Sequence, residues 1–223
     1  MIKACLFDLD GTLLNTITTI AHFGNYALGE HGISPIECDD YKLLVGNGAK
    51  KLVERMLRKQ GVYSEEMYAS VYNCYMKAYD ASPTYLTEPY DGIEDMLVAL
   101  KKRGIMVGVI SNKPDYAAKS VCRQKLPSEL IDAVQGQIEG LPIKPDVSGP
   151  MQVLERLGAL PEETIYAGDS GVDIQTGRNL KSFTVGVSWG FRSVEELMEN
   201  GADRIVCAPH EIIDIADKLN MES

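Results

Sequence analysis

Two aspartates, Asp8 and Asp10, stand directly after the apolar run Ala4-Cys5-Leu6-Phe7. The run predicts a buried strand, so two carboxylates lie one residue apart at the end of that strand. Buried anions repel each other and lose hydration, which is costly unless a cation or a proton compensates. Mg²⁺ is a suitable cation because it prefers oxygen ligands. The pair therefore indicates a metal-assisted phosphoryl-transfer site.

Length and charge limit the classes of protein to which the chain can belong. Its 223 residues fit one domain, or one domain that carries an insertion. A net charge of −10 argues against non-specific binding to nucleic acid or to an anionic membrane, where Lys and Arg supply the affinity. An anionic substrate must therefore be attracted by a local positive site.

The cysteines and the apolar segments predict a protein of a reducing compartment. Five cysteines are present, widely separated and without a C-x-x-C pair, which argues against a zinc site or a disulfide framework. No stretch approaches the roughly 18 apolar residues of a membrane span. The amino terminus does not resemble a signal peptide, because Asp8 and Asp10 interrupt its apolar run. We therefore expect a cytoplasmic protein.

Short apolar runs alternate with helical patterns after about residue 83, which predicts an α/β fold with a mostly parallel sheet. The expected strands are residues 2–7, 106–110, 164–168, 183–187 and 204–207, and a helix is expected over 92–103. Residues 15–82 show only helical spacing, including a stripe of tyrosines that could form core packing or line a pocket. A helical insertion after the first strand, with hinges near residues 14 and 83, is the expected organisation.

Polar residues follow three of the predicted strands. Ser111-Asn112-Lys113 and Asp169-Ser170 each end such a strand, and Asp173 follows four residues after Asp169. Ligands bind outside the carboxyl ends of the strands in open α/β sheets, so these groups should converge with Asp8 at one edge. Ser111 and Asn112 could also cap the next helix, and Asp169 and Asp173 could favour a helix N-terminus. The histidines lack metal-ligand spacing and are expected to be structural: His22, His31 and His210.

Four motifs in one order resemble those of the haloacid dehalogenase superfamily phosphatases, over nearly the whole chain. They are Asp8-Leu9-Asp10-Gly11-Thr12, Ser111-Asn112-Lys113, Lys144-Pro145-Asp146 and Gly168-Asp169-Ser170-Gly171-Val172-Asp173. Three further runs are similar to the phosphoglycolate phosphatase-like branch: Leu13-Leu14-Asn15-Thr16, Val45-Gly46-Asn47-Gly48 and Ser188-Trp189-Gly190-Phe191-Arg192. Asn15 and Val147 depart from the family's usual Asp and Pro, which weakens the assignment of an exact substrate.

The resemblance implies a Rossmann-like α/β parallel-sheet core, residues 1–14 and 83–223, with a helical cap domain inserted over residues 15–82. It implies a phosphatase in which Asp8 attacks phosphorus and Asp10 acts as general acid and base. Phosphoryl oxygens would be bound by Ser111, Asn112 and Lys144. Mg²⁺ would be held by Asp8, the main-chain carbonyl of Asp10, Asp169 and, through water or by orienting a ligand, Asp173.

The closing cap favours a small phosphorylated metabolite as substrate, and phosphoglycolate, a sugar phosphate, a nucleoside monophosphate and pyrophosphate all stay open. A sugar phosphomutase shares the core residues and is the closest enzymatic alternative, and a catalytically silent binding protein is a further one. Asp10 disfavours dehalogenation, which needs no acid at that position. The sequence does not decide the oligomeric state or the roles of Asn47, Trp189 and Arg192, nor whether Gly46-Asn47-Gly48 is a loop over the site or a plain turn.

Overall fold

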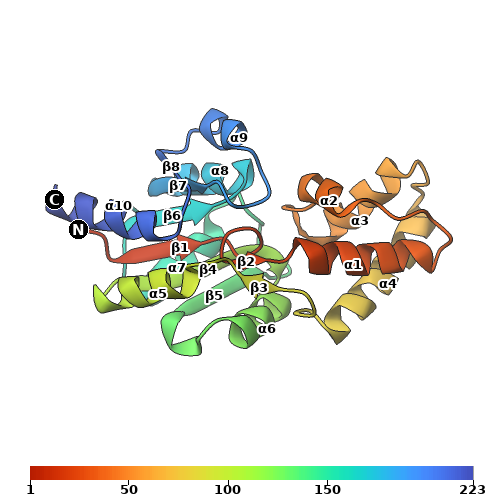
Figure 1. Cartoon of the computed structure of the whole chain (residues 1–223), viewed down its shortest axis with the longest axis horizontal. Coiled ribbons are helices and arrows are strands. Elements are labelled where there is room, and N and C mark those ends of the chain that lie inside the picture. The colour runs from red at the N-terminus through yellow and green to blue at the C-terminus, as the bar shows by residue number, and fades with distance from the viewer. Residues whose placement is uncertain (223) are drawn as a thin grey trace.

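The computed structural model describes residues 1–222, so Ser223, the last residue of the predicted core, lies outside it. Within these residues six strands form one sheet in the order β5-β4-β1-β6-β7-β8, and every neighbouring pair is parallel (Figure 1). They are β1 (Ala4–Phe7), β4 (Met106–Pro114), β5 (Ala133–Gln137), β6 (Thr164–Gly168), β7 (Phe183–Val187) and β8 (Arg204–Val206). The predicted parallel α/β fold is confirmed.

Helices cover both faces of the sheet, which explains why its strands are continuous apolar runs. Along β1, Cys5 and Phe7 pack on one face and Leu6 on the other, and all three are fully buried. The first face packs against α5 (Ile93–Lys102), α6 (Asp115–Lys125) and α10 (His210–Met221). The second packs against α7 (Ser148–Leu157) and α8 (Gly171–Leu180), while α9 (Val194–Glu199) lies beside β7 and β8. Two short 3-10 helices complete the core: Ser128–Leu130 and Pro161–Glu163.

The predicted helix over residues 92–103 is present as α5. Its buried residues Ile93, Met96, Leu97 and Leu100 repeat at helical spacing, so one face of the helix packs on the sheet. Acidic residues occupy its first turn and lysines its last, an arrangement that the helix dipole favours.

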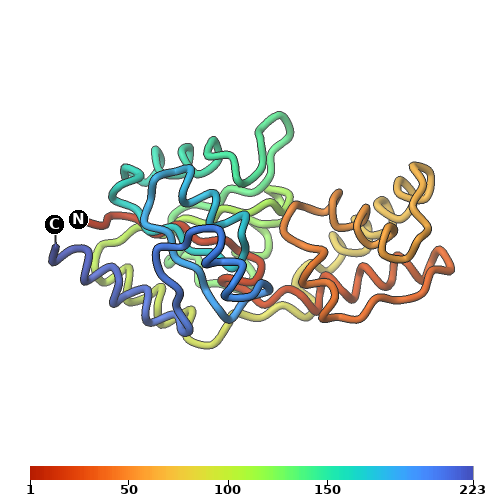
Figure 2. Tube along the Cα trace, turned by 90° about the horizontal axis from the view of Figure 1, so that it is seen from above, coloured from red at the N-terminus to blue at the C-terminus, as the bar shows by residue number. Residues whose placement is uncertain are grey.

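The four helices between residues 15 and 88 form a separate bundle: α1 (Ile17–Gly29), α2 (Cys38–Leu44), α3 (Gly48–Lys59) and α4 (Glu65–Ala81). They pack around a hydrophobic cluster, which Phe191 from the loop after β7 joins, at the opposite end of the molecule from the two termini (Figure 2). The chain leaves the core and returns to it through two short antiparallel strands, β2 (Leu14–Asn15) and β3 (Glu88–Pro89). The bundle therefore joins the sheet next to the end of β1.

The two-residue strands β2 and β3 were not predicted, and the larger departures from the predicted strands concern β5 and β4. The edge strand β5 is not predicted from the sequence, because the polar residues Gln135 and Gln137 flank Gly136 and hide the apolar alternation. Strand β4 continues through Ser111, Asn112 and Lys113 to Pro114, beyond the predicted end at residue 110. Since α6 begins at Asp115, with Pro114 in the capping position, Ser111 and Asn112 do not cap that helix.

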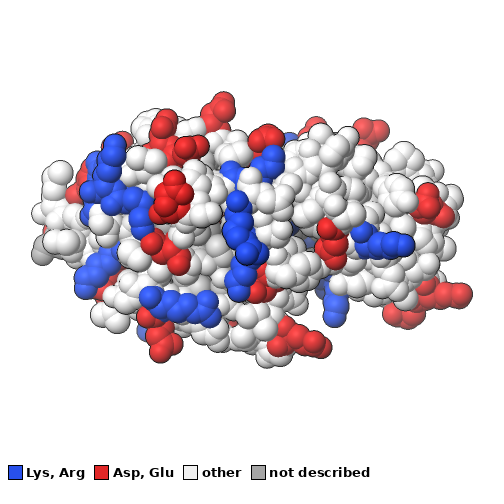
Figure 3. All heavy atoms as spheres, turned by 90° about the horizontal axis from the view of Figure 1, so that it is seen from below, with Lys and Arg blue, Asp and Glu red and all other residues white. Residues whose placement is uncertain are grey.

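Charged side chains of both signs are spread over the surface of this chain, which has 22 basic and 32 acidic residues (Figure 3). On the face shown in Figure 3, Lys and Arg side chains are interspersed with Asp and Glu. None of the helices in the described part of the chain combines the length and the apolar character that crossing a membrane requires.

Candidate active site

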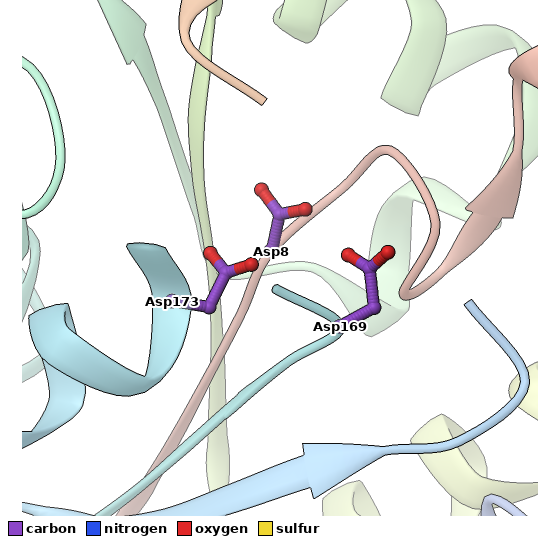
Figure 4. Close-up of side chains that lie close together, drawn as sticks. All are labelled: Asp8, Asp169 and Asp173. Carbon is purple, nitrogen blue, oxygen red and sulfur yellow. The ribbon is translucent and has the colours of Figure 1, made fainter. Parts of the chain in front are cut away.

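Three buried carboxylates meet at the carboxyl edge of the sheet. Asp8 follows β1, Asp169 follows β6 and Asp173 lies in the first turn of α8. Their side chains are turned to the same side, and carboxylate oxygens from the three lie within 4.8 Å of one another (Figure 4). Each residue is at most 6% exposed. The structure thus brings together the three acidic side chains that the sequence motifs single out for metal binding.

Lys144 is the cation that faces two of these carboxylates. Its ammonium contacts an oxygen of Asp8, lies 2.7 Å from Asp173 Oδ1 and donates to the carbonyl of Ile110 at 3.2 Å. Burial opposes the charge of Lys144, but Asp173 and Asp8 outweigh that effect and raise its pKa well above the ordinary value. One buried ammonium is therefore shared between two buried carboxylates.

Negative charge is in excess at this cluster. Burial, and then repulsion from Asp173, raises the pKa of Asp8 well above its ordinary value, although Lys144 acts in the opposite direction. Burial and Asp173 likewise raise the pKa of Asp169 to about 7. Three carboxylates face one ammonium, so the cluster has excess negative charge that a divalent cation would neutralise. Their oxygens are also the ligands that hard cations prefer. The residues present therefore fit a hard metal ion.

Asp173 has a second task at the start of α8. Its Oδ2 accepts hydrogen bonds from the backbone N–H and the hydroxyl of Ser170, which in turn caps the helix. The suggested N-terminal role of Asp173 is thus present together with its contact to Lys144. Both of its oxygens are engaged, so the side chain is held rigidly in the cluster.

Glycines leave room for the backbone to approach Asp169. Gly11 has a positive φ of 96°, and a Cβ there would lie 2.4 Å from Asp169 Oδ2. A Cβ on Gly190 would lie 2.2 Å from Asp169 Cβ. The space lets Thr12 and the backbone N–H of Phe191 donate to the carboxylate, at 3.3 and 2.7 Å. Two distant segments therefore close on this aspartate.

Asp10 lies beside the cluster and is paired with a lysine whose role sequence reasoning missed. Lys113 Nζ lies 2.9 Å from Asp10 Oδ2, and both side chains are largely buried. The same ammonium stands over the ring of Tyr79 from α4, 5.1 Å from the ring centre. Lys113 follows Ser111-Asn112 directly, so its place in that motif was the available signal. This lysine connects the core to the helical bundle.

The side chain of Asn112 connects the second and third motifs with the helical bundle. Its amide oxygen accepts from the backbone N–H of Lys144 at 2.9 Å, and its amide nitrogen donates to the carbonyl of Gly46 at 3.0 Å. Ser111 Oγ accepts from the backbone N–H of Lys113 at 3.1 Å, which leaves the hydroxyl proton of Ser111 available for a ligand. Asn112 therefore fixes the backbone of Lys144 and the loop at Gly46.

A pocket lies above these groups, between the sheet edge and the helical bundle. Its floor includes Asp8, Asp10, Ser111, Asn112, Lys144, Asp169 and Asp173. The bundle supplies a mostly apolar wall: Ile20, Val45, Ala49, Leu52, Tyr75, Met76 and Tyr79. Tyr75 and Tyr79 also belong to the bundle's core, so both uses suggested for the tyrosine stripe occur. Gly46 and Gly48 line the pocket, so the glycine-containing loop lies over the site.

The structure gives contacts to the remaining residues of uncertain role. Asn47 accepts a hydrogen bond from Arg55 at 2.7 Å and therefore stabilises the loop. Trp189 packs against the core and donates to the carbonyl of Thr12 at 2.9 Å. Arg192 lines the pocket itself. His31 bonds to Ala27 and Ser70, as expected of a structural histidine.

Comparisons with known proteins agree with this geometry. The model of the haloacid dehalogenase-like hydrolase family matches residues 5–187. The chain is 29% identical to an N-acetylmuramic acid 6-phosphate phosphatase of Pseudomonas aeruginosa, over 97% of this chain and 96% of that protein. It is 29% identical to a phosphoglycolate phosphatase of Aquifex aeolicus, over 99% of each chain. A crystal structure from Lactobacillus delbrueckii subsp. bulgaricus, provisionally assigned as a phosphoglycolate phosphatase, superposes with a TM-score of 0.91 at 28% identity, over 96% of this chain and 98% of that one.

Proposed function

This chain belongs to the haloacid dehalogenase-like hydrolase family and is a phosphoric monoester hydrolase. We propose that it hydrolyses a small, phosphoglycolate-like phosphomonoester through an aspartyl-phosphate on Asp8. The observation that carries the proposal is the buried Asp8 carboxylate on the floor of the pocket, next to Asp10 and Lys144. Relatives named as phosphatases of two different small phosphoesters support the substrate class.

In the first step an oxygen of Asp8 attacks phosphorus, and the bond from phosphorus to the leaving oxygen breaks. Asp10 gives its proton to that oxygen, so the alcohol leaves neutral. In the second step Asp10 takes a proton from water, which attacks the phosphorus of the aspartyl-phosphate and releases phosphate and free Asp8. The position of Asp10 beside the nucleophile, fixed by Lys113, supports this acid–base role.

Positive and hydrogen-bonding groups offset the charge of the phosphoryl group. Lys144 reduces repulsion between Asp8 and the phosphate, because its ammonium already touches the nucleophile. Ser111 and Asn112 are proposed to bind phosphoryl oxygens from the end of β4. Since the side-chain amide of Asn112 is occupied by Lys144 and Gly46, the Ser111 hydroxyl is the freer donor of the two.

We propose Mg²⁺ as the metal, held by Asp8, the main-chain carbonyl of Asp10 and Asp169, with Asp173 orienting the site. When bound, the ion supplies positive charge that neutralises the phosphate and the acidic cluster. The raised pKa values of Asp8 and Asp169 support this, because a hard cation would relieve the repulsion that raises them.

The domain boundaries belong to the same proposal: a core of residues 1–14 and 83–223, and a cap of residues 15–82. The hydrophobic cluster formed mainly by cap residues and the paired strands β2 and β3 support hinges at these points. A cap that closes over the pocket excludes water and restricts the substrate to a small molecule. A small phosphorylated metabolite in the cytoplasm is therefore the proposed partner.

The test is phosphate release from a panel of small phosphomonoesters, with Mg²⁺ and with excess chelator. Asp8→Asn should lower kcat at least about 1000-fold, because it removes the nucleophile. Asp39→Asn is the matched control, since this exposed aspartate on α2 pairs with Lys42 at 2.9 Å and does not line the pocket. Release without Mg²⁺, or retained in Asp8→Asn, would contradict the proposal. Phosphoryl transfer to Asp8 without net release would instead indicate a phosphomutase.

A further inference from the structure

Arg192 occupies a distinctive place on the wall of the pocket. It follows Phe191, whose backbone N–H donates to Asp169, and it therefore starts close to the proposed metal ligands. From there its Nη2 reaches across to the helical bundle and donates to the carbonyl of Val45 at 3.0 Å. The guanidinium thus lies at the seam between the core and the bundle, and it lines the pocket.

One end of this guanidinium is buried without a partner. The Nη1 atom is inaccessible to solvent and has no hydrogen-bond acceptor among the described residues. A buried donor of a charged group that lacks an acceptor is costly, so natural structures seldom keep one without a reason. The nearest carboxylate, Glu196, lies 3.6 Å from Nε and already accepts from the backbone N–H of Gly171 at 2.9 Å. The charge of Arg192 is therefore only partly balanced.

The two lysines that line the pocket differ from Arg192 in this respect. Lys113 is paired with Asp10 at 2.9 Å, and Lys144 is paired with Asp8 and Asp173. Of the three cations that line the pocket in the described part of the chain, Arg192 alone has a nitrogen atom without any hydrogen-bond partner and no carboxylate within 3.5 Å. It is therefore the cation best placed to receive a second charged group of a ligand.

We infer that Arg192 binds an anionic group, a carboxylate or a second phosphate, on the leaving-group side of the substrate, which rests on the proposed phosphatase function. The phosphoryl group lies over Asp8, and the leaving group extends along the apolar wall toward the seam at Val45. Arg192 is then a specificity-determining residue. The acidic cluster would repel a second anion elsewhere in the pocket, so this arginine is what makes such a substrate acceptable.

The test compares phosphomonoesters that differ in the charge of the leaving group. With saturating Mg²⁺, kcat and KM are measured for 2-phosphoglycolate against ethyl phosphate, for 3-phosphoglycerate against glycerol 1-phosphate, and for pyrophosphate. The parent should have a higher kcat/KM for the member of each pair whose leaving group is anionic. Whether the carboxylate substrates or pyrophosphate are preferred then identifies the anion that Arg192 binds. Arg192→Gln should raise KM for that substrate about 10- to 100-fold, the effect of losing a charge-assisted hydrogen bond, and change its neutral counterpart little. Arg192→Lys should recover part of the preference.

Arg55 provides the matched control for a purely structural role. It holds the same loop from within the bundle, through the carbonyls of Leu44 and Val45 at 2.9 and 3.3 Å, but does not line the pocket. If Arg192 only fixes this loop, Arg55→Gln and Arg192→Gln should affect charged and neutral substrates alike, and that result overturns the inference. A parent that hydrolyses both members of each pair equally well also overturns it, while leaving the phosphatase function intact. No release from any ester overturns the proposed function and the inference together.

Discussion

Replacing Lys144 with methionine would remove the only cation that touches Asp8 and Asp173 among the described residues. Methionine has a similar length and would fill most of the space, so the change chiefly removes charge. The Lys144 side chain is 5% exposed, and the side chains of Asp8 and Asp173 are 9% and 2% exposed. The variant would therefore leave an acidic cluster buried without its internal counter-charge.

The expected cost follows from this burial. Breaking a buried ion pair by removing one partner costs about 3–5 kcal/mol, because the other charge stays buried and uncompensated. The two pairs share one ammonium, so their costs are not additive and the same range applies. Protein stability is typically about 5–15 kcal/mol, which makes this a large fraction. In chelator, Lys144→Met should thus lower the free energy of unfolding by about 3–5 kcal/mol.

The assay is urea unfolding at pH 8, in chelator and in Mg²⁺. Mg²⁺ at about 100 times its dissociation constant adds about 2.7 kcal/mol to a protein that binds it only when folded. The variant should gain at least as much as the parent from the ion, because its carboxylates carry no competing ammonium. Lys101→Met is the control: its pair with Asp132 is 26% and 18% exposed, so about 1 kcal/mol or less is expected.

A clear result would refute this reasoning. If Lys144→Met unfolds within about 1 kcal/mol of the parent in chelator, the three carboxyl groups do not need the ammonium and are neutralised by protons instead. If Mg²⁺ stabilises the parent but not the variant, Lys144 helps to build the metal site rather than to balance its charge.

Three further predictions concern the site and the core. Lys113→Met should lower kcat about 10- to 100-fold with little change in KM, because it frees Asp10 from its 2.9 Å contact with the ammonium. Lys113→Arg should restore part of the rate, and a change in KM alone would contradict this prediction. Asp169 has a pKa raised to about 7 in the folded protein, against about 3.9 unfolded, so stability in chelator should fall as pH rises between these values. Asp169→Asn should flatten that dependence in thermal unfolding, and parallel curves would refute the assignment. Burial raises the pKa of Cys5 to about 12, so a thiol reagent at pH 8 should label the exposed Cys38 in the folded protein and Cys5 only after unfolding, as read by peptide mass spectrometry.

Local sequence was enough for the parts of the fold that local rules govern. The apolar run before Asp8 predicted β1, and the helical spacing of Ile93, Met96, Leu97 and Leu100 predicted α5. Strand β5 was missed because an edge strand needs less apolar surface, and Gln135 and Gln137 carry no clear alternation. The extension of β4 to Pro114 also depends on pairing with β5, which no local pattern reveals.

The sequence by itself determined which side chains make up the candidate site, because its motifs place acidic, hydroxyl and lysine residues after strands whose ends the structure brings to one sheet edge. It determined the family and the position of Asp8 in the same way. Only the tertiary structure decided the pairings: Lys113 with Asp10, Asn112 with Gly46, and Arg192 between Val45 and the pocket. The two contacts that reach the bundle join residues that are 66 and 147 positions apart in the sequence. Their energies depend on burial and on neighbouring charge, which exist only once the chain has folded.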